Sequence, residues 1–172
     1  IKSNLTSPDT ILLHQALEKM KKNKVENVIV EASSHGLDQK RISHLNLKAA
    51  IFTNFSQDHL DYHGSMDAYK EAKAKLFTLG SLKKAVINKD DEYAAHLQGL
   101  LSPDVEVKTY GCKNPADIRL ISARFNRKGI SLSVSCSGFK FSVDLPLFGT
   151  FNVENILATL ATLDSMGWSG EE

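Results

Sequence analysis

Two polar segments carry side chains that could bind a metal ion or transfer a proton. In the first, EASSHGLDQKR, the carboxylate Glu31 directly follows the apolar run VIV, and Ser33, His35 and Arg41 come soon after it. A carboxylate at the end of a buried strand can hold Mg²⁺ directly or through water, because Mg²⁺ prefers oxygen ligands. Glu31 could equally cap a neighbouring helix while the serines form a turn, and this segment alone leaves both interpretations open.

The second segment, FTNFSQDHLDYHG, brings carboxylates and imidazoles together after another apolar run. It contains Asp58, His59, Asp61 and His63. Clustered carboxylate and imidazole groups indicate metal or proton chemistry. Taken alone, however, such a run is better explained as a solvated loop.

Lys73 belongs to the helical pattern that follows this segment. It lies one helical turn after Tyr69 and one turn before Phe77, beside the apolar side of the helix, whereas Lys70 and Lys75 are better placed to face water. An amine near apolar side chains is more often neutral, and a neutral amine can react with carbon dioxide. On the helical pattern alone, a lysine that extends its ammonium to the surface is the simpler interpretation.

An α/β fold is expected to position these segments. Apolar strands are predicted at residues 25–32, 48–54, 84–88 and 105–110, with helices at 11–20 and 66–79 and another from Asp90 to Leu100. This alternation predicts a mostly parallel sheet flanked by helices. From Asp117 to Val143 the apolar period changes to two, which predicts a small antiparallel hairpin sheet, and a last helix is predicted at 153–166.

The carboxyl ends of parallel strands form one edge of a sheet, where ligands gather. We therefore expect Glu31, His59 and Lys73 to meet at that edge. The loops at residues 33–36 and 55–65 are expected to be polar and irregular.

Composition excludes several classes of protein. The 172 residues are 42% hydrophobic and suit one domain, and a net charge of +1 gives no broad positive surface for nucleic acid or an anionic membrane. Cys112 and Cys136 lack metal-ligand spacing, and no segment resembles a signal peptide or a membrane span. We expect a cytoplasmic monomer, and the ends of the sequence indicate a piece of a longer chain.

Three blocks, taken together, resemble the Mur ligases. They are EASSHGLDQKR at residues 31–41, TNFSQDHLDYHGSMDAYKEAKAKLF at 53–77 and FGTFNVENILATLA at 148–161. The similarity extends from LTSPDT to the last helix, and the motifs SSHGL and DHLDYHG resemble those of the tripeptide synthetase branch of the family.

The resemblance implies the central, ATP-binding domain of a peptidoglycan-precursor ligase, with a P-loop NTPase-like fold. Residues 1–172 would be a partial domain, because G-x-x-x-x-G-K-[ST] is absent from them, as are the N-terminal UDP-binding and C-terminal amino-acid-binding domains. ATP would phosphorylate the terminal carboxylate of UDP-N-acetylmuramoyl-L-Ala-D-Glu. The amine of meso-diaminopimelate or L-lysine would then displace phosphate. The isolated chain is expected to be inactive in ligation.

The resemblance also implies roles for individual residues in metal binding. Glu31 would hold the Mg²⁺ that bridges the β- and γ-phosphates of ATP, and His59 would bind a second Mg²⁺. Lys73 matches a lysine that family members carry as a carbamate, which would be an anion able to support the second metal.

Substrate contacts are implied in the same way. Thr6 and Ser7 match a Thr-Thr pair beside the nucleotide-sugar peptide, although Ser7 departs from threonine, and Ser33 and Arg41 match a serine and an arginine on that ligand.

Asn152 and Asn155 match the family's N-x-x-N on the adenine side of ATP; helix capping is the other explanation, especially for Asn152. Folylpolyglutamate synthetase, a relative that would share the ATP and metal residues, and a non-catalytic nucleotide-binding module remain alternatives to a cell-wall ligase.

Overall fold

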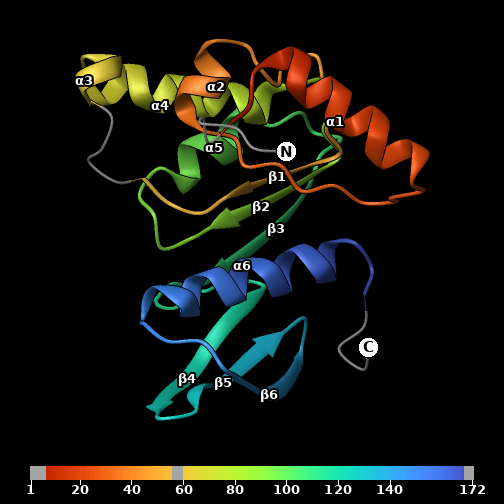
Figure 1. The fold of residues 1–172 in the computed structure, drawn as a ribbon. Coiled ribbons are helices and arrows are strands. Elements are labelled where there is room, and N and C mark those ends of the chain that lie inside the picture. The colour runs from red at the N-terminus through yellow and green to blue at the C-terminus, as the bar shows by residue number, and fades with distance from the viewer. Residues whose placement is uncertain (1–6, 56–59, 169–172) are drawn as a thin grey trace. The chain divides into compact units, whose positions relative to one another are not determined.

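A mixed sheet with the strand order β1-β2-β3-β4-β5-β6 organises the larger part of the structure, a computed structural model that describes residues 7–55 and 60–168 (Figure 1). The chain divides into two compact units. One comprises residues 1–47 and 57–79, and the other comprises residues 48–56 and 80–172.

The first unit is helical among its described residues. Its elements are α1 (Thr10–Lys22), α2 (Ser34–Asp38), α3 (Leu60–His63), α4 (Met66–Ala74) and the 3₁₀ helix η1 (Lys75–Thr78). Side-chain caps fix three of the helix starts. The Asp9 carboxylate accepts from the Leu12 N–H at 3.0 Å, and Ser33 and Ser65 cap α2 and α4 in the same manner.

The predicted strand at residues 25–32 is wrong. The segment is extended but pairs with no strand in the described part of the chain, and Ile29 is 88% exposed. An apolar run favours burial, but a strand also needs a neighbouring backbone to satisfy its N–H and C=O groups. The polar loop predicted at 33–36 is likewise replaced by the start of α2.

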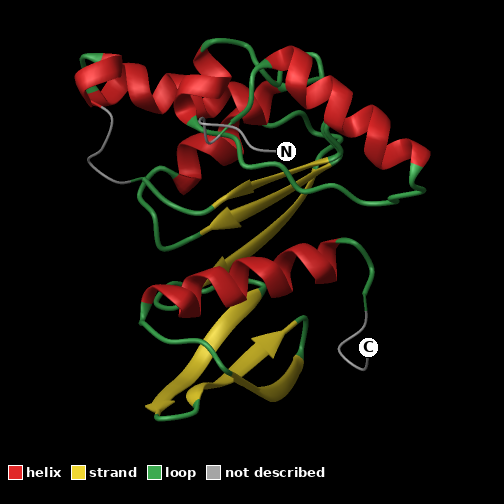
Figure 2. Ribbon diagram, in the orientation of Figure 1, coloured by secondary structure: helices red, strands yellow, loops and turns green. Residues whose placement is uncertain are grey.

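The second unit holds the whole sheet and two helices. Its elements are β1 (Ala49–Phe52), β2 (Lys84–Asn88), α5 (Ala94–Leu100), β3 (Glu106–Gly111), β4 (Ile118–Asn126), β5 (Gly129–Cys136), β6 (Phe139–Leu145) and α6 (Phe151–Ser165). The pairs β1–β2, β2–β3 and β3–β4 are parallel, whereas β4–β5 and β5–β6 form antiparallel hairpins (Figure 2). The predicted α/β fold is confirmed, and the hairpins continue the parallel sheet, because β4 pairs with the end of β3.

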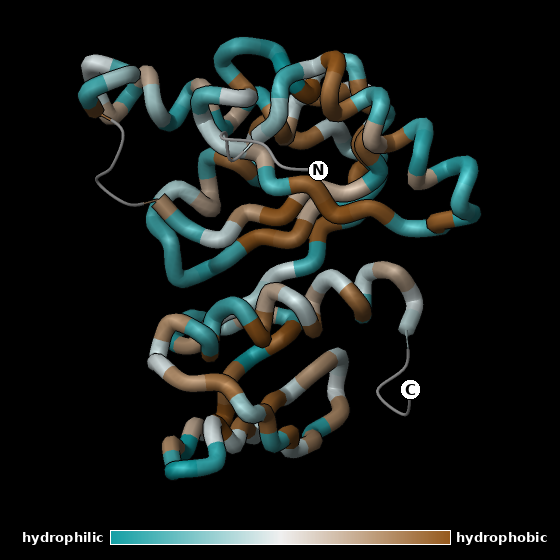
Figure 3. Tube along the Cα trace, in the orientation of Figure 1, coloured by the Kyte–Doolittle hydropathy of each residue, from teal (hydrophilic) through white to brown (hydrophobic). Residues whose placement is uncertain are grey.

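Helix α6 covers the sheet of this unit and closes its core. The apolar stretches along the strands are visible in Figure 3. The buried residues of this core are Val86, Tyr110, Ile118, Ile130, Leu132, Val134, Val153, Ile156, Leu157, Ala158 and Ala161. Burying apolar side chains from both the sheet and α6 stabilises their packing against one another. No helix in the described residues is long and apolar enough to cross a membrane.

Two carboxylates hold the loops at the carboxyl ends of the parallel strands. Asp91 accepts from the backbone N–H groups of Phe55 at 2.7 Å and Tyr93 at 2.9 Å. Asp90 accepts from three backbone N–H groups in the loop that follows β3, of which Cys112 and Asn114 are two. Because both carboxylates serve these loops, the helix predicted from Asp90 begins later, at the start of α5.

Candidate functional site

Ser7 is fully buried at the centre of the predicted substrate-binding residues. Its Oγ donates to the carbonyl oxygen of Glu31 at 2.8 Å and accepts from the Ser33 N–H at 2.9 Å. The two serine hydroxyl oxygens are 3.0 Å apart. The structure therefore brings Ser7, Ser33 and the main chain of Glu31 together. The Ser7 hydroxyl forms its hydrogen bonds with other groups of the protein.

Gly36 allows this close approach. Its N–H donates to Ser33 Oγ at 3.1 Å, which caps α2. A Cβ at position 36 would lie 2.7 Å from Ser7 Cβ and 2.8 Å from Ser7 Oγ. Ser34, next to the cap, is buried, and its hydroxyl has no hydrogen-bond partner among the described residues. Glycine is thus required in the SSHGL sequence for packing around Ser7.

Arg41 joins the same cluster. Its Nη1 donates to the Ser7 carbonyl oxygen at 2.8 Å, and its Nη2 donates to Gln39 Oε1. Three of the four predicted substrate contacts, Ser7, Ser33 and Arg41, therefore lie together. The fourth, Thr6, falls outside the described residues.

The side chains predicted to bind metal are not shown to meet. Glu31 is exposed at the end of the extended segment, while Lys73 lies half-buried on α4 of the same unit, and His59 falls outside the described residues. Within the described ranges, no three His, Cys, Asp or Glu side chains gather closely enough to hold a metal ion. The meeting of these three residues at the sheet edge stays a prediction.

Lys73 lies beside apolar surface, as its helical position predicts. Its Nζ is 5.1 Å from the centroid of the Tyr69 ring, which is buried. Lys75 is exposed and pairs with Asp38 at 2.7 Å, whereas Lys70, predicted to face water, is half-buried. The hydrogen bond and charge of Lys75 hold the pKa of Asp38 below its usual value.

A cluster of aromatic and histidine rings, which the sequence analysis did not find, ties α2, α3 and α4 together. The rings of His35 and Tyr62 are 4.1 Å apart between centroids, and His63 lies 4.8 Å from Tyr62 and 5.4 Å from Tyr69. His63 was singled out with carboxylates as a metal or proton-transfer group, but it packs among rings. The spacing of rings in DYHG and in the following helix is the only sequence signal of this packing.

The second unit carries the residues predicted to lie near adenine. Asn152 Nδ2 donates to the Phe148 carbonyl oxygen at 2.7 Å, and Asn152 Oδ1 accepts from Asn155 Nδ2 at 3.4 Å. Asn152 is therefore inside α6 rather than at its cap position, which Thr150 occupies. Burial raises the pKa values of Tyr110 and Cys112, and the negative charge of Glu154, in the first turn of α6, contributes further to both.

Cys112 has no reactive character in this setting. Burial, with smaller contributions from Glu154 and Asp90, raises its pKa to about 11. The thiol therefore stays protonated at neutral pH, and a protonated thiol is a poor nucleophile and metal ligand.

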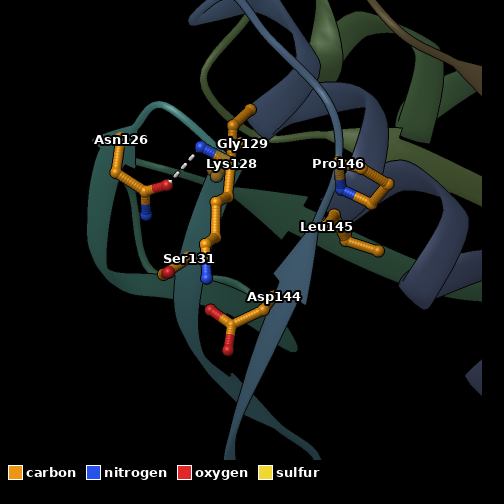
Figure 4. Close-up of a pocket in the computed structure, with 8 residues that line it drawn as sticks. Asn126, Lys128, Gly129, Ser131, Asp144, Leu145 and Pro146 are labelled. Carbon is orange, nitrogen blue, oxygen red and sulfur yellow. Dashed lines mark hydrogen bonds between the residues drawn. The ribbon is translucent and has the colours of Figure 1, made fainter.

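A cavity of about 360 Å³ lies elsewhere in this unit, at the β4–β5 turn and the end of β6 (Figure 4). Its lining residues are Asn126, Lys128, Gly129, Ile130, Ser131, Asp144, Leu145 and Pro146. None of the predicted site residues contributes to it. We therefore assign this cavity no part in binding metal, nucleotide or substrate.

The family is decided by comparison with known proteins. Residues 2–163 match the model of the Mur ligase middle domain. The chain belongs to the Mur ligase middle-domain family. This confirms the resemblance recognised in the three sequence blocks, and it accounts for the order in which those blocks occur.

Among curated relatives, this Mur ligase middle domain is similar to UDP-N-acetylmuramoyl-L-alanyl-D-glutamate 2,6-diaminopimelate ligases. It is 42% identical over 159 residues to that of Chromobacterium violaceum, covering 92% of this chain and 32% of the relative. It is 39% identical to that of Neisseria meningitidis serogroup A, covering 95% of this chain and 34% of the relative. The chain thus spans about a third of the length of these relatives.

A solved structure of a ligase with the same name has a similar fold. The TM-score is 0.87 at 36% identity, and the match covers 94% of this chain and 34% of the other. The similarity therefore extends to the fold of nearly the whole Mur ligase middle domain described here.

Proposed function

We propose that the chain is the central, nucleotide-handling part of a longer ligase that joins 2,6-diaminopimelate to UDP-N-acetylmuramoyl-L-alanyl-D-glutamate. The observation that carries this proposal is its similarity, along nearly its whole length, to relatives bearing that name. The missing parts would be an N-terminal domain for the UDP portion and a C-terminal domain for the amino acid. The complete enzyme would act as a cytoplasmic monomer.

ATP and Mg²⁺ are the proposed cofactors. Glu31 is exposed, so its carboxylate can reach a hydrated cation, and its main chain is held by Ser7. Bound Mg²⁺ would supply positive charge that neutralises the phosphates during phosphoryl transfer. His59 is proposed to bind a second ion. Glu31 fits a magnesium site, because carboxylate oxygen is a ligand that Mg²⁺ prefers.

Lys73 is proposed to be carbamylated. In this step the neutral amine nitrogen bonds to the carbon of carbon dioxide, and a proton is released to solvent. The half-buried position on α4 supports the proposal, since Lys73 is held near the protein body. In the full-length ligase, Lys73→Ala should lose activity that formate or acetate partly restores. Lys75→Ala, at the exposed partner of Asp38, is the control and should need no rescue. A Lys73→Ala enzyme of normal activity would contradict this role.

The nucleotide-sugar peptide is proposed to contact the Ser7, Ser33 and Arg41 cluster together with Thr6. Ser7 has no exposed surface and its hydroxyl is engaged by Glu31 and Ser33. Its proposed contribution is therefore to hold the neighbours that touch the ligand. Arg41 is half-buried and could present its remaining N–H groups to a carboxylate.

The test of the function is phosphate release by the full-length ligase. Release should require ATP, the nucleotide-sugar dipeptide and 2,6-diaminopimelate together, with L-lysine as the matched alternative amino acid. Stimulation by a folate substrate would instead favour folylpolyglutamate synthetase, and no hydrolysis would favour a non-catalytic module. The isolated chain should release no phosphate above background, and turnover at the full-length rate would overturn its assignment as a part.

A further inference from the structure

A chain of hydrogen bonds joins the tyrosine of the DHLDYHG segment to the Arg41 guanidinium. Arg41 Nη2 donates to Gln39 Oε1, and Gln39 Nε2 donates to the Tyr62 hydroxyl oxygen at 3.0 Å. The Tyr62 hydroxyl donates in turn to Asp38 Oδ2 at 3.2 Å. All four residues belong to the first unit. Tyr62, on α3, therefore reaches the arginine through a single amide.

The chemistry of these groups fixes the direction of every bond in the chain. An ionised carboxylate can only accept, so the hydroxyl hydrogen of Tyr62 points to Asp38 and the hydroxyl oxygen accepts from Gln39. The Gln39 amide must then turn its NH₂ group to Tyr62 and its oxygen to Arg41. In the opposite orientation the NH₂ group would face the guanidinium, and two donors would meet. Tyr62 thus selects the one orientation of Gln39 that can accept from Arg41.

The Tyr62 ring is held by contacts that do not involve its hydroxyl. The ring centroid lies 4.1 Å from that of His35 on α2 and 4.8 Å from that of His63. Ring pairs at such distances attract one another beyond the apolar surface that they bury. A phenylalanine at position 62 would therefore keep the ring packing and lose only the two hydrogen bonds of the hydroxyl.

Arg41 depends on this chain for one of its two anchors. The other anchor is the bond from Nη1 to the Ser7 carbonyl oxygen at 2.8 Å. A single bond would leave the guanidinium plane free to turn about one nitrogen, whereas the second bond, from Nη2 to Gln39, fixes that plane. A planar guanidinium binds a carboxylate best through two parallel hydrogen bonds. Its affinity for a carboxylate therefore depends on how the plane is oriented.

We propose that Tyr62 is a positioning residue for the nucleotide-sugar peptide. Its hydroxyl holds the Gln39 amide and, through that amide, directs Arg41 toward a carboxylate of the ligand. The inference rests on the proposed contact between Arg41 and this ligand. It adds a residue of α3 that affects substrate binding without touching the substrate. Tyr62 follows the proposed metal residue His59 by three positions, so one segment serves both the metal and the substrate cluster.

The test is equilibrium binding of UDP-N-acetylmuramoyl-L-Ala-D-Glu to the full-length ligase. Tyr62→Phe should weaken this binding about two- to tenfold, the range expected for one lost neutral hydrogen bond. In an Arg41→Ala background the same change should have no further effect, because the hydroxyl acts through that guanidinium. ATP binding should not change. In steady-state kinetics, KM for the dipeptide should rise while kcat stays unchanged, since binding is weakened before and during the reaction alike.

Tyr93→Phe is the matched control, because it makes the same chemical change in the second unit, where the Tyr93 ring packs against those of Phe55 and His96. It should bind the dipeptide as the unaltered ligase does. Thermal unfolding of each variant establishes that it is folded. If Tyr62→Phe is not folded, Asp38→Ala provides a second test, since it leaves the Tyr62 hydroxyl without its acceptor and should also weaken dipeptide binding.

Unchanged dipeptide binding by Tyr62→Phe would overturn the inference. So would equal losses with Arg41 present and with Arg41→Ala, because the hydroxyl would then act by a route that does not include the guanidinium. Neither result would affect the proposed ligation, which phosphate release measures separately. An unaltered ligase that binds no UDP-N-acetylmuramoyl-L-Ala-D-Glu would instead overturn the proposed function, and this inference with it.

Discussion

The guanidinium of Arg41 donates from Nη1 to the main-chain carbonyl oxygen of Ser7 at 2.8 Å. A side chain predicted to bind substrate therefore also joins the turn after α2 to the segment before α1. Because Ser7 in turn holds the Glu31 carbonyl and the Ser33 N–H, Arg41 helps to fix the main chain around the proposed magnesium carboxylate.

Replacement of Arg41 should consequently affect both stability and substrate binding. Arg41→Lys cannot bond to both Ser7 and Gln39 with fork geometry, and we expect it to lower the free energy of unfolding by about 1 to 3 kcal/mol. Urea denaturation of the chain measures this. In the full-length ligase, KM for the nucleotide-sugar dipeptide should rise. Arg127→Lys, at an exposed turn, should leave both quantities unchanged. Equal stability of the two variants would contradict the role given to Arg41.

Gly36→Ala should destabilise the first unit. The added Cβ would approach Ser7 Cβ to 2.7 Å, and the buried Ser7 side chain is held by its hydrogen bonds with Glu31 and Ser33. Such overpacking costs about 1 to 3 kcal/mol. Gly99→Ala is the control, because nothing lies within 4 Å of its Cβ position in α5, and it should stabilise by about 0.5 to 1 kcal/mol. Denaturation curves in which Gly36→Ala is neutral would show that the serine packing is looser than described.

The ion pair between Lys108 and Asp164, 2.7 Å long, should give the second unit a pH-dependent contribution to stability. Burial would raise the pKa of Asp164, but the hydrogen bond and charge of Lys108 lower it overall from the ordinary 3.8. The hydrogen bond that Lys108 donates to Asp164 raises the pKa of Lys108 above 10.5. The ion pair therefore makes its full contribution to the stability of the second unit between pH 3.8 and pH 10.5. It is lost as pH falls below 3.8 through the lowered pKa, and as pH rises above 10.5 through the raised pKa.

Asp164→Asn should remove this contribution. The variant should be less stable than the unaltered chain at pH 7, and the difference should shrink as the pH falls below 3.8. Glu18→Gln removes an exposed pair with Lys22 and serves as the control, since exposed pairs contribute little. A stability difference that persists undiminished at pH 2 would show that Asp164 acts through something other than its charge.

Much of the fold could be predicted because it depends on local periodicity. Strand β2 was predicted with the bounds that the structure has, and the hairpins and the last helix were also predicted correctly. The strand at 25–32 was wrong because the apolar run could not reveal whether a neighbouring backbone was available. The helix expected from Asp90 began later because that carboxylate binds N–H groups of a distant loop.

The candidate site, like the fold, could be predicted from the sequence only in part. The family resemblance grouped Ser7, Ser33 and Arg41 as substrate contacts, and that role stays a prediction. The structure shows that Ser7 hydrogen-bonds with both Ser33 and Arg41. Spacing alone could not predict that the Ser7 hydroxyl is hydrogen-bonded to other groups of the protein. Nor could it show that His63 packs against Tyr69, because that contact depends on how two helices meet.

The most direct test of the central claim is the position of a divalent cation in crystals of the full-length ligase. With Mn²⁺ in place of Mg²⁺ and a non-hydrolysable ATP analogue, anomalous scattering should give a peak about 2 to 2.5 Å from the Glu31 carboxylate, or one water molecule away. Glu31→Ala should remove that peak. A phosphate-bound metal remote from Glu31, or a peak unchanged in Glu31→Ala, would contradict the account.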